Sequence, residues 1–109
     1  DTYLLHWLHS RLNLNEIIHN LNHLREWQLV RFVGLSNVTT YRIQRALDLG
    51  MPVSVVQNEM SSLFLDTELL EFCHQKNILL QNWFALGHAK SNEFDYMLAL
   101  TKKYGKTPA

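Results

Sequence analysis

Four short apolar runs, each ending in polar or aromatic residues, constrain the fold of this 109-residue chain more than any other feature. The clearest run is 32–37, where Phe-Val-Gly-Leu gives way to Ser36 and Asn37. The other three runs span residues 2–6, 53–58 and 78–83. A helix-like amphipathic stretch follows each run. Buried strands that alternate with helices indicate parallel strands joined by right-handed crossovers, so the sequence predicts an α/β fold of order βαβαβαβα.

The element boundaries follow from periodicity and from capping residues. We expect strands at Thr2–His6, Val30–Ser36, Val53–Gln57 and Ile78–Trp83, with the first strand buried. We expect helices at 14–28 after an Asn13 cap, from Thr39 or Thr40 to Leu49, at 67–77 after an Asp66 cap, and at 93–104 before Gly105. Leu69, Leu70, Phe72 and Cys73 should point inward from the third helix. The whole chain, 1–109, is interpreted as one domain, with 59–65 as a loop.

The bulk composition excludes several classes of partner. Ten basic and ten acidic residues cancel, which argues against nucleic acid and anionic membrane as main partners. Hydrophobic residues make up 47% of the chain, enough for a packed core, and no apolar run approaches the roughly 20 residues that span a bilayer. Cys73 is the only cysteine, so an internal disulfide is impossible and a cytoplasmic location is expected.

Chemistry in parallel α/β folds lies at the carboxyl ends of the strands. In this chain those ends carry His6-Trp7, Ser36-Asn37, Gln57-Asn58-Glu59 and Trp83. If the strands are adjacent, one rim offers an imidazole, a hydroxyl, amides and a flat aromatic face. Such a set suits a planar, amide-bearing ring held next to a carbonyl group.

These same residues resemble the motifs of the aldo-keto reductases. Leu4-Leu5-His6-Trp7 is similar to the family's L-L-H-W-P, and Gly34-Leu35-Ser36-Asn37 to its G-V-S-N. Val56-Gln57-Asn58-Glu59 is similar to V-Q-N-E, and 83–87, Trp-Phe-Ala-Leu-Gly, to Y-S-P-L-G. Residues 103–109 resemble K-Y-G-K-T-P-A. The matches occur in the family's order and cover essentially the whole chain.

The resemblance implies a (β/α)8 TIM barrel of which this chain forms strands four to seven, a half-barrel. It also implies reduction of aldehydes or ketones to alcohols with NADPH or NADH. His6 would be the catalytic histidine that hydrogen-bonds the substrate carbonyl, and Trp7 would contact the substrate. The residues expected at the cofactor are Ser36, Asn37 and Gln57 on the nicotinamide carboxamide, Trp83 stacked on the ring, and Phe84 and Leu86 beyond it.

The departures from the family pattern are compatible with a second, non-catalytic function. Leu8 replaces the family's proline, and Phe84 supplies no hydroxyl for a cofactor phosphate. The family's proton-donating Tyr, with its Lys and Asp partners, belongs to strands before this segment, and Tyr3 and Tyr41 do not match that motif. We therefore expect the isolated chain to be inactive and to self-associate through open sheet edges. The alternative is a non-catalytic binding or regulatory module of the same fold.

Each candidate residue also has a purely structural interpretation. His6 and Trp83 could be core residues, Ser36-Asn37 could cap the next helix, and Gln57 could be buried and bonded to backbone. His19 and His23 stand four residues apart, but no Glu follows His19 and both fall on a polar helix face, so no metal site is expected. Cys73 is expected to be a small buried hydrophobic side chain.

Overall fold

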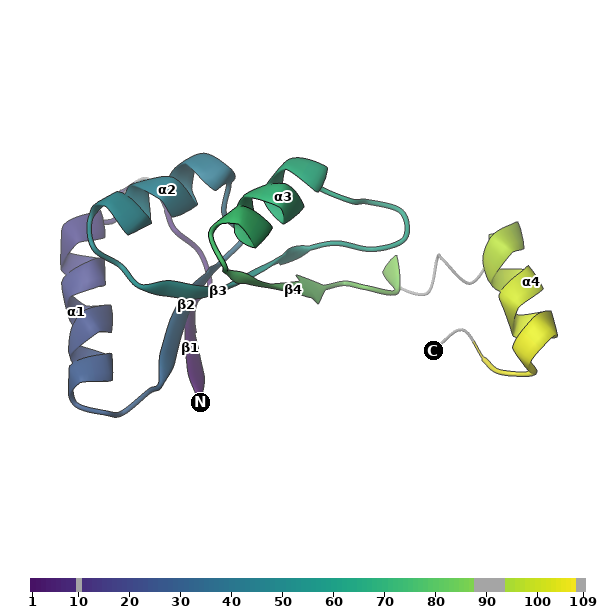
Figure 1. Ribbon diagram of the computed structural model, residues 1–109, viewed down its shortest axis with the longest axis horizontal. Helices are drawn as coiled ribbons and strands as arrows, with labels where there is room; N and C mark the ends of the chain where they lie inside the picture. Colours follow the sequence, from purple (N-terminus) through teal and green to yellow (C-terminus); the bar gives the residue numbers. More distant parts are fainter. Residues whose placement is uncertain (10, 88–93, 108–109) are drawn as a thin grey trace. The chain divides into compact units, whose positions relative to one another are not determined.

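The computed structural model describes residues 1–9, 11–87 and 94–107. Strands and helices alternate along the chain, as Figure 1 shows. The elements are β1 (Thr2–Leu5), α1 (Leu14–Glu26), β2 (Phe32–Ser36), α2 (Thr40–Asp48), β3 (Val53–Glu59), α3 (Thr67–Gln75), β4 (Leu79–Trp83) and α4 (Asp95–Tyr104). The order is the βαβαβαβα predicted from the sequence.

The strands form one sheet in the order β1-β2-β3-β4. β1 pairs with β2 in parallel, with Leu5 opposite Leu35, and β2 pairs with β3 in parallel, with Ser36 opposite Gln57. Sequential, parallel neighbours joined by helices are the arrangement of a (β/α)8 barrel wall. The predicted α/β fold of TIM-barrel type is confirmed. The strand ends of β1 and β2 therefore meet at one edge of the sheet.

The chain divides into two compact units, which are described separately. The first comprises Asp1–Asn58 with Asp66–Gln81, and the second comprises Glu59–Leu65 with Asn82–Ala109. The second unit holds the end of β4, a bridge between Ser61 and Phe64, and α4.

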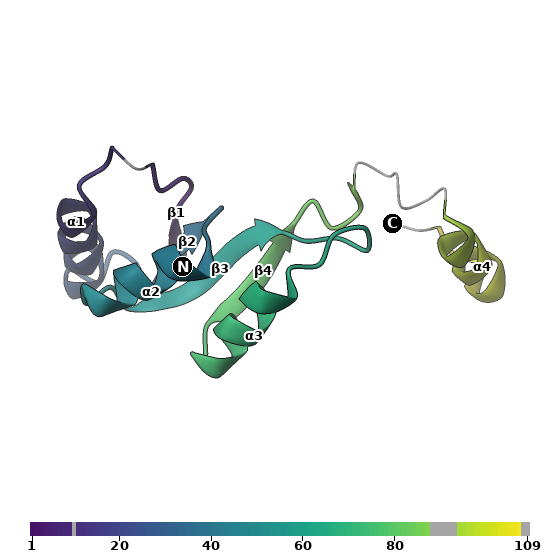
Figure 2. The same cartoon turned by 90° about the horizontal axis from the view of Figure 1, so that it is seen from above.

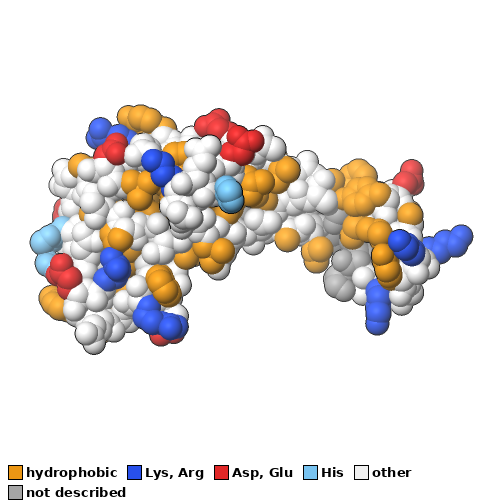
Figure 3. All heavy atoms as spheres, viewed as in Figure 1, with side chains coloured by type: hydrophobic (Ala, Val, Ile, Leu, Met, Phe, Trp, Pro, Cys, Tyr) orange, Lys and Arg blue, Asp and Glu red, His pale blue; other side chains and the backbone are white. Residues whose placement is uncertain are grey.

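The core of the first unit lies between its helices and the sheet. Figures 1 and 2 show α2 and α3 side by side over the sheet. The side chains with almost no exposure are Val33, Leu35, Ile43, Ala46, Met51, Val56, Leu69 and Cys73. On the face seen in Figure 3, acidic and basic side chains are interspersed with apolar ones. No helix of the described residues combines the length and the apolar character needed to cross a membrane.

Side-chain caps begin three helices where the sequence predicts them. Asn13 accepts hydrogen bonds from the amides of Asn15 (3.2 Å) and Glu16 (3.5 Å) at the start of α1. Thr39 caps α2, and the Asp66 carboxylate accepts from the Leu69 amide at 2.9 Å to cap α3. These acceptors satisfy amides that have no partner inside the helix. Gly105 ends α4 at φ 59°, the left-handed conformation that favours glycine.

Two predictions about burial are wrong. β1 is not a buried strand, because Thr2 and Tyr3 are exposed and the strand pairs only with β2 among the described elements. Leu70 is 45% exposed, although it was expected to point inward. Leu69 and Cys73 lie one turn apart and define the buried side of α3, and Leu70 is rotated about 100° away from it.

Several boundaries also differ from the predicted ones. β1 ends at Leu5 rather than at His6, β2 starts at Phe32 rather than at Val30, and β4 starts at Leu79 rather than at Ile78. β3 continues to Glu59, two residues beyond the predicted end. The helices α1, α2 and α3 end at Glu26, Asp48 and Gln75. Gln28, the predicted last residue of the first helix, has a φ of 59°, which is incompatible with a right-handed α-helix. The predicted start of the last helix at residue 93 lies outside the described residues, and α4 begins at Asp95.

Candidate active site

The main-chain oxygen of Gln57 joins the ends of β2 and β3. It accepts the hydroxyl of Ser36 at 2.7 Å and the backbone amide of Asn37 at 3.1 Å. Ser36 is 2% exposed, so its hydroxyl is buried within the sheet edge. A buried hydroxyl needs a partner, and the neighbouring strand supplies one. The two strand ends are thereby held in fixed register at the point where the predicted cofactor residues begin.

Asn37 joins this pair to the end of β1. Its side-chain nitrogen donates to the main-chain oxygen of His6 at 3.1 Å and to the Ser36 hydroxyl at 3.2 Å. The backbone of Asn37 is left-handed, with φ 56°, a conformation that Asn tolerates better than most residues. A continuous chain of hydrogen bonds therefore brings together four predicted site residues, namely His6, Ser36, Asn37 and Gln57.

The imidazole of His6 is exposed, so the interpretation as a core histidine is wrong. Its ring centroid lies 5.8 Å from that of Trp7, with the planes inclined by 54°. Trp7 is 51% exposed. The next residue, Leu8, is buried, and its main-chain oxygen accepts a hydrogen bond from the guanidinium of Arg42 on α2. This contact fixes the loop that carries both aromatic rings.

The side chain of Gln57 is half-buried rather than enclosed. Its amide nitrogen donates to the side-chain oxygen of Gln81 on β4 at 3.2 Å. The interpretation as a buried residue bonded to backbone is therefore wrong. The helix-cap interpretation of Ser36-Asn37 is also wrong, because Thr39 supplies the cap of α2.

The side chain of Asn58, a strand-end residue for which the sequence predicts no role, is hydrogen-bonded to the backbone of Val38. Its side-chain oxygen accepts from the amide of Val38 at 3.1 Å, and its nitrogen donates to the oxygen of Val38 at 2.8 Å. The two bonds resemble those of a strand pair and lie two residues beyond the end of β2. Asn is unfavourable inside a strand, and that conflict within β3 is the sequence signal for a specific hydrogen-bonding role.

Gly34 allows β2 and β3 to approach closely enough for these contacts. A Cβ atom at residue 34 would lie 2.1 Å from the main-chain oxygen of Val55 and 2.7 Å from Leu4 Cδ2. The pairing register also shifts between Val33 and Gly34. A glycine inside a strand often marks such a close backbone approach.

The remaining predicted cofactor residues belong to the second unit. Trp83 ends β4, is half-buried, and packs its ring 5.7 Å from that of Phe84 at an angle of 66°. Phe84 has a positive φ of 64°, and its main-chain oxygen accepts from the amide of Gly87 at 2.8 Å. Leu86 is 43% exposed. The roles of these three residues at a cofactor stay predictions.

The other singled-out residues lie away from the strand ends. His19 and His23 on α1 pack edge to face, with ring centroids 4.1 Å apart, and His23 stacks on Trp27. Cys73 is 1% exposed, which confirms it as a small buried side chain. Burial, followed by the nearby negative charge of Asp66, raises the pKa of the Cys73 thiol. The thiol is therefore protonated and unreactive near neutral pH.

The chain resembles known proteins over nearly its whole length. The sequence model of the aldo/keto reductase family matches residues 1–101. The chain is 30% identical over 113 residues to a 9,11-endoperoxide prostaglandin H2 reductase of Trypanosoma cruzi, an alignment covering 100% of this chain and 40% of that protein. It is 29% identical over 90 residues to an uncharacterised oxidoreductase of Schizosaccharomyces pombe, covering 82% of this chain and 32% of that protein.

Solved structures agree in fold. The apoform of Gox0644 superposes with a TM-score of 0.91 at 27% identity, covering 99% of this chain and 41% of the other. A Gox0644 variant in complex with NADPH gives a TM-score of 0.90. An aldo/keto reductase of Brucella melitensis gives 0.88 at 25% identity. The chain spans about 40% of the length of these relatives. By its sequence and its fold, the chain belongs to the aldo-keto reductase family.

Proposed function

We propose that this segment forms the carbonyl-binding and nicotinamide-binding side of an NADPH-dependent aldo-keto reductase that converts aldehydes or ketones to alcohols. The proposal rests above all on the hydrogen-bond chain from Gln57 through Ser36 and Asn37 to His6. That chain gathers an exposed imidazole and two side-chain amides at the same strand ends. Family membership and an NADPH complex of a structural relative support it.

The side chains at the strand ends fit a nicotinamide carboxamide. A carboxamide has both donors and acceptors, and so do the amides of Asn37 and Gln57. The Ser36 hydroxyl donates to Gln57 and accepts from Asn37, and keeps a second lone pair. Motif similarity alone, without any geometry, supports cofactor contacts by Trp83, Phe84 and Leu86. When bound, NADPH would supply the hydride.

His6 would act on the substrate oxygen. An imidazole N–H aimed at a carbonyl stabilises the negative charge that develops there during reduction. The hydrogen bond from Asn37 to the His6 main chain and the bond from Arg42 to Leu8 would hold the imidazole in place. The exposed indole of Trp7 would contact the substrate.

The proton that completes an alcohol is assigned to the family's tyrosine from another part of the barrel. The two tyrosines of the first unit are poorly placed for that role. Tyr3 lines the space between β1 and α1, and Tyr41 is 71% exposed on α2. Their placement supports a second candidate function, a non-catalytic module that binds the nicotinamide.

One pair of measurements separates the two functions. The first is NADPH affinity by fluorescence titration, and the second is oxidation of NADPH with a small aldehyde, both on the protein that contains this segment. For the reductase, His6→Ala should lower turnover about 100-fold while leaving NADPH affinity unchanged. Asn37→Ala should weaken NADPH binding. Binding without turnover in the parent protein would favour the module, and no NADPH binding would refute both.

A further inference from the structure

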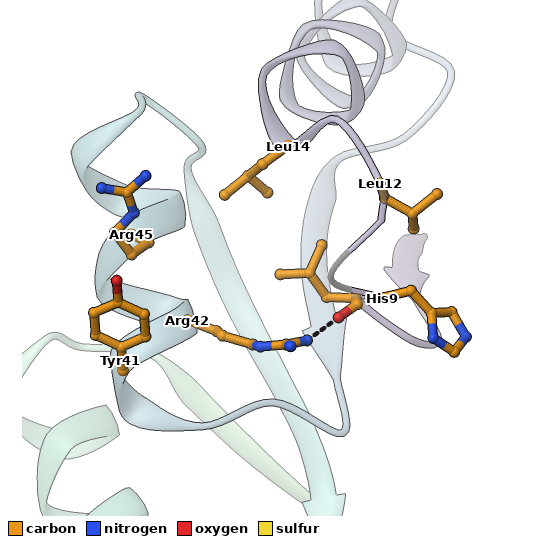
Figure 4. Close-up of a pocket in the computed structure, with 7 residues that line it drawn as sticks. His9, Leu12, Leu14, Tyr41, Arg42 and Arg45 are labelled. Atoms are coloured by element: carbon orange, nitrogen blue, oxygen red, sulfur yellow. Dashed lines mark hydrogen bonds between the residues drawn. The ribbon is translucent and has the colours of Figure 1, made fainter.

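A small cavity is lined by none of the predicted site residues at the strand ends. It has a volume of about 150 Å³ and opens between the loop after β1, the start of α1 and the outer side of α2. Its lining residues are Leu8, His9, Leu12, Leu14, Tyr41, Arg42 and Arg45. Figure 4 shows Arg42 reaching from α2 toward the loop, while Leu14 projects from the start of α1 toward the space between them. A cavity of about 150 Å³ accepts a molecule the size of benzene.

Two guanidinium groups border this cavity without an acidic partner. Arg42 and Arg45 stand three residues apart on α2, so they are neighbours on its surface. The ion pairs within the described residues join His23 to Glu26 and Arg31 to Asp1, and none includes either arginine. Like charges at this spacing repel each other. A bound anion would relieve the repulsion.

The arginines keep donors for such an anion. Arg42 uses one nitrogen, Nη1, for the main-chain oxygen of Leu8, and a guanidinium has five N–H groups. Arg45 is exposed and lines the cavity, so its guanidinium is accessible to a ligand bound there. A planar fork of donors matches a carboxylate in particular.

The rest of the lining is apolar. Leu8 is 7% exposed, Leu14 is half-buried, and Leu12 adds a third aliphatic side chain. An inorganic anion would leave these surfaces without a partner, and a long acyl chain would exceed the volume. We propose that this cavity binds a small monocarboxylate whose apolar body is about the size of one six-membered ring, with its carboxylate on Arg45 and Arg42.

Sodium benzoate is a suitable probe, with benzyl alcohol as its neutral counterpart. Calorimetric titration of the chain should give saturable benzoate binding with Kd near about 1 mM, as expected for a ligand of this size, and much weaker binding of the alcohol. Arg45→Gln should weaken benzoate binding at least about tenfold, because it removes a charge-assisted contact. Arg25→Gln on α1 is the matched control and should bind as the parent does. Circular dichroism would verify that each variant is folded.

The site of binding has an independent readout. Leu8 follows Trp7 directly, so occupation of the cavity should shift the Trp7 indole resonance in a titration followed by NMR. The proposal is overturned if benzoate does not saturate, if Arg45→Gln binds it as well as Arg25→Gln does, or if His6→Ala abolishes binding while Arg45→Gln does not. The last result would place the carboxylate at the strand ends instead. NADPH binding, measured separately, tests the proposed function and is independent of these outcomes.

Discussion

The side chain of Asn58 binds both backbone polar groups of Val38, accepting from its amide at 3.1 Å and donating to its oxygen at 2.8 Å. Val38 follows Asn37, the residue with the left-handed backbone that also reaches His6. Asn58 therefore restrains the turn from its far side, while Gln57 restrains it from the strand. The conformation of Asn37 depends on this side-chain amide as well as on its own hydrogen bonds.

Asn58→Ala should loosen the Asn37 turn and weaken NADPH binding. We expect a loss of about 1–3 kcal/mol in the free energy of unfolding from two hydrogen bonds, and a roughly tenfold rise in Kd for NADPH. Fluorescence titration and chemical denaturation measure the two effects. Asp66→Ala, which removes the α3 cap at a cost of about 1 kcal/mol, is the control for lost stability and should leave Kd unchanged. An equal rise in both variants would contradict the positioning role.

Asn58→Asp provides a pH-dependent comparison. An ionised Asp could accept from the Val38 amide but would face the Val38 oxygen with negative charge. A protonated Asp regains a donor and so restores both contacts. NADPH affinity of this variant should improve as the pH falls toward about 4, whereas that of Asn58→Ala should not. Parallel pH profiles for the two variants would argue against the hydrogen-bond explanation.

Gly34→Ala should be among the most destabilising single-methyl changes in this chain. The added Cβ would overlap the main-chain oxygen of Val55 at 2.1 Å, and backbone cannot move aside as a flexible side chain does. We expect a loss of about 3 kcal/mol from overpacking. Gly50→Ala is the matched control, since nothing lies within 4 Å and only its φ of +85° opposes the change. That variant should lose about 1 kcal/mol, and urea denaturation should rank the two in this order.

The Cys73 thiol should make stability fall in alkaline solution. Its pKa is raised in the folded state by burial and by Asp66, so the folded protein holds the proton that the unfolded chain releases. The stabilisation is complete below the ordinary value of 9.0 and is lost as the pH rises through the folded pKa. Thermal unfolding of the parent and of Cys73→Ala between about pH 8 and 10.5 measures this. The difference in Tm between the two proteins should shrink with rising pH, and a constant difference would exclude the linkage.

The exposed edge of β1 should promote self-association of the chain. β1 pairs with β2 alone among the described elements, and unpaired edges template pairing with other chains. Light scattering should give a mass above the 12.8 kDa of the monomer. Tyr3→Lys, which adds a charge at this edge, should lower the association, and Tyr41→Lys on α2 should not. A concentration-independent monomer would contradict the expectation.

The order of elements was predictable because it rests on local signals. The runs at 32–37 and 53–58 are apolar enough to be strands, and Asn13, Thr39 and Asp66 mark helix starts by their own side chains. The exposure of Thr2 and Tyr3 on β1 could not be inferred from the apolar pattern of the strand, because burial depends on what covers the strand. Leu70 was misplaced because an apolar residue next to the buried side of α3 fits the pattern without being covered.

The proximity of four predicted site residues could be anticipated from the sequence, but the hydrogen-bond network that joins them could not. Motif similarity indicated His6, Ser36, Asn37 and Gln57, and the structure gathers them. Motif similarity did not indicate that the Ser36 hydroxyl donates to the main-chain oxygen of Gln57, or that the Asn37 side chain donates to that of His6. The pairing of Gln57 with Gln81 joins residues 24 positions apart and has no local sequence signal.

The Gln57 oxygen that holds two strand ends together is part of the peptide bond, so no amino-acid substitution can delete it. Alanine scanning would score residue 57 by its side chain alone and would overlook this contribution. Replacing the amide that follows Gln57 with an ester, by chemical synthesis, would weaken the acceptor without altering any side chain. Because this contact is made by the main chain, it can persist when the side chains change. A solved structure at 27% identity does share the fold.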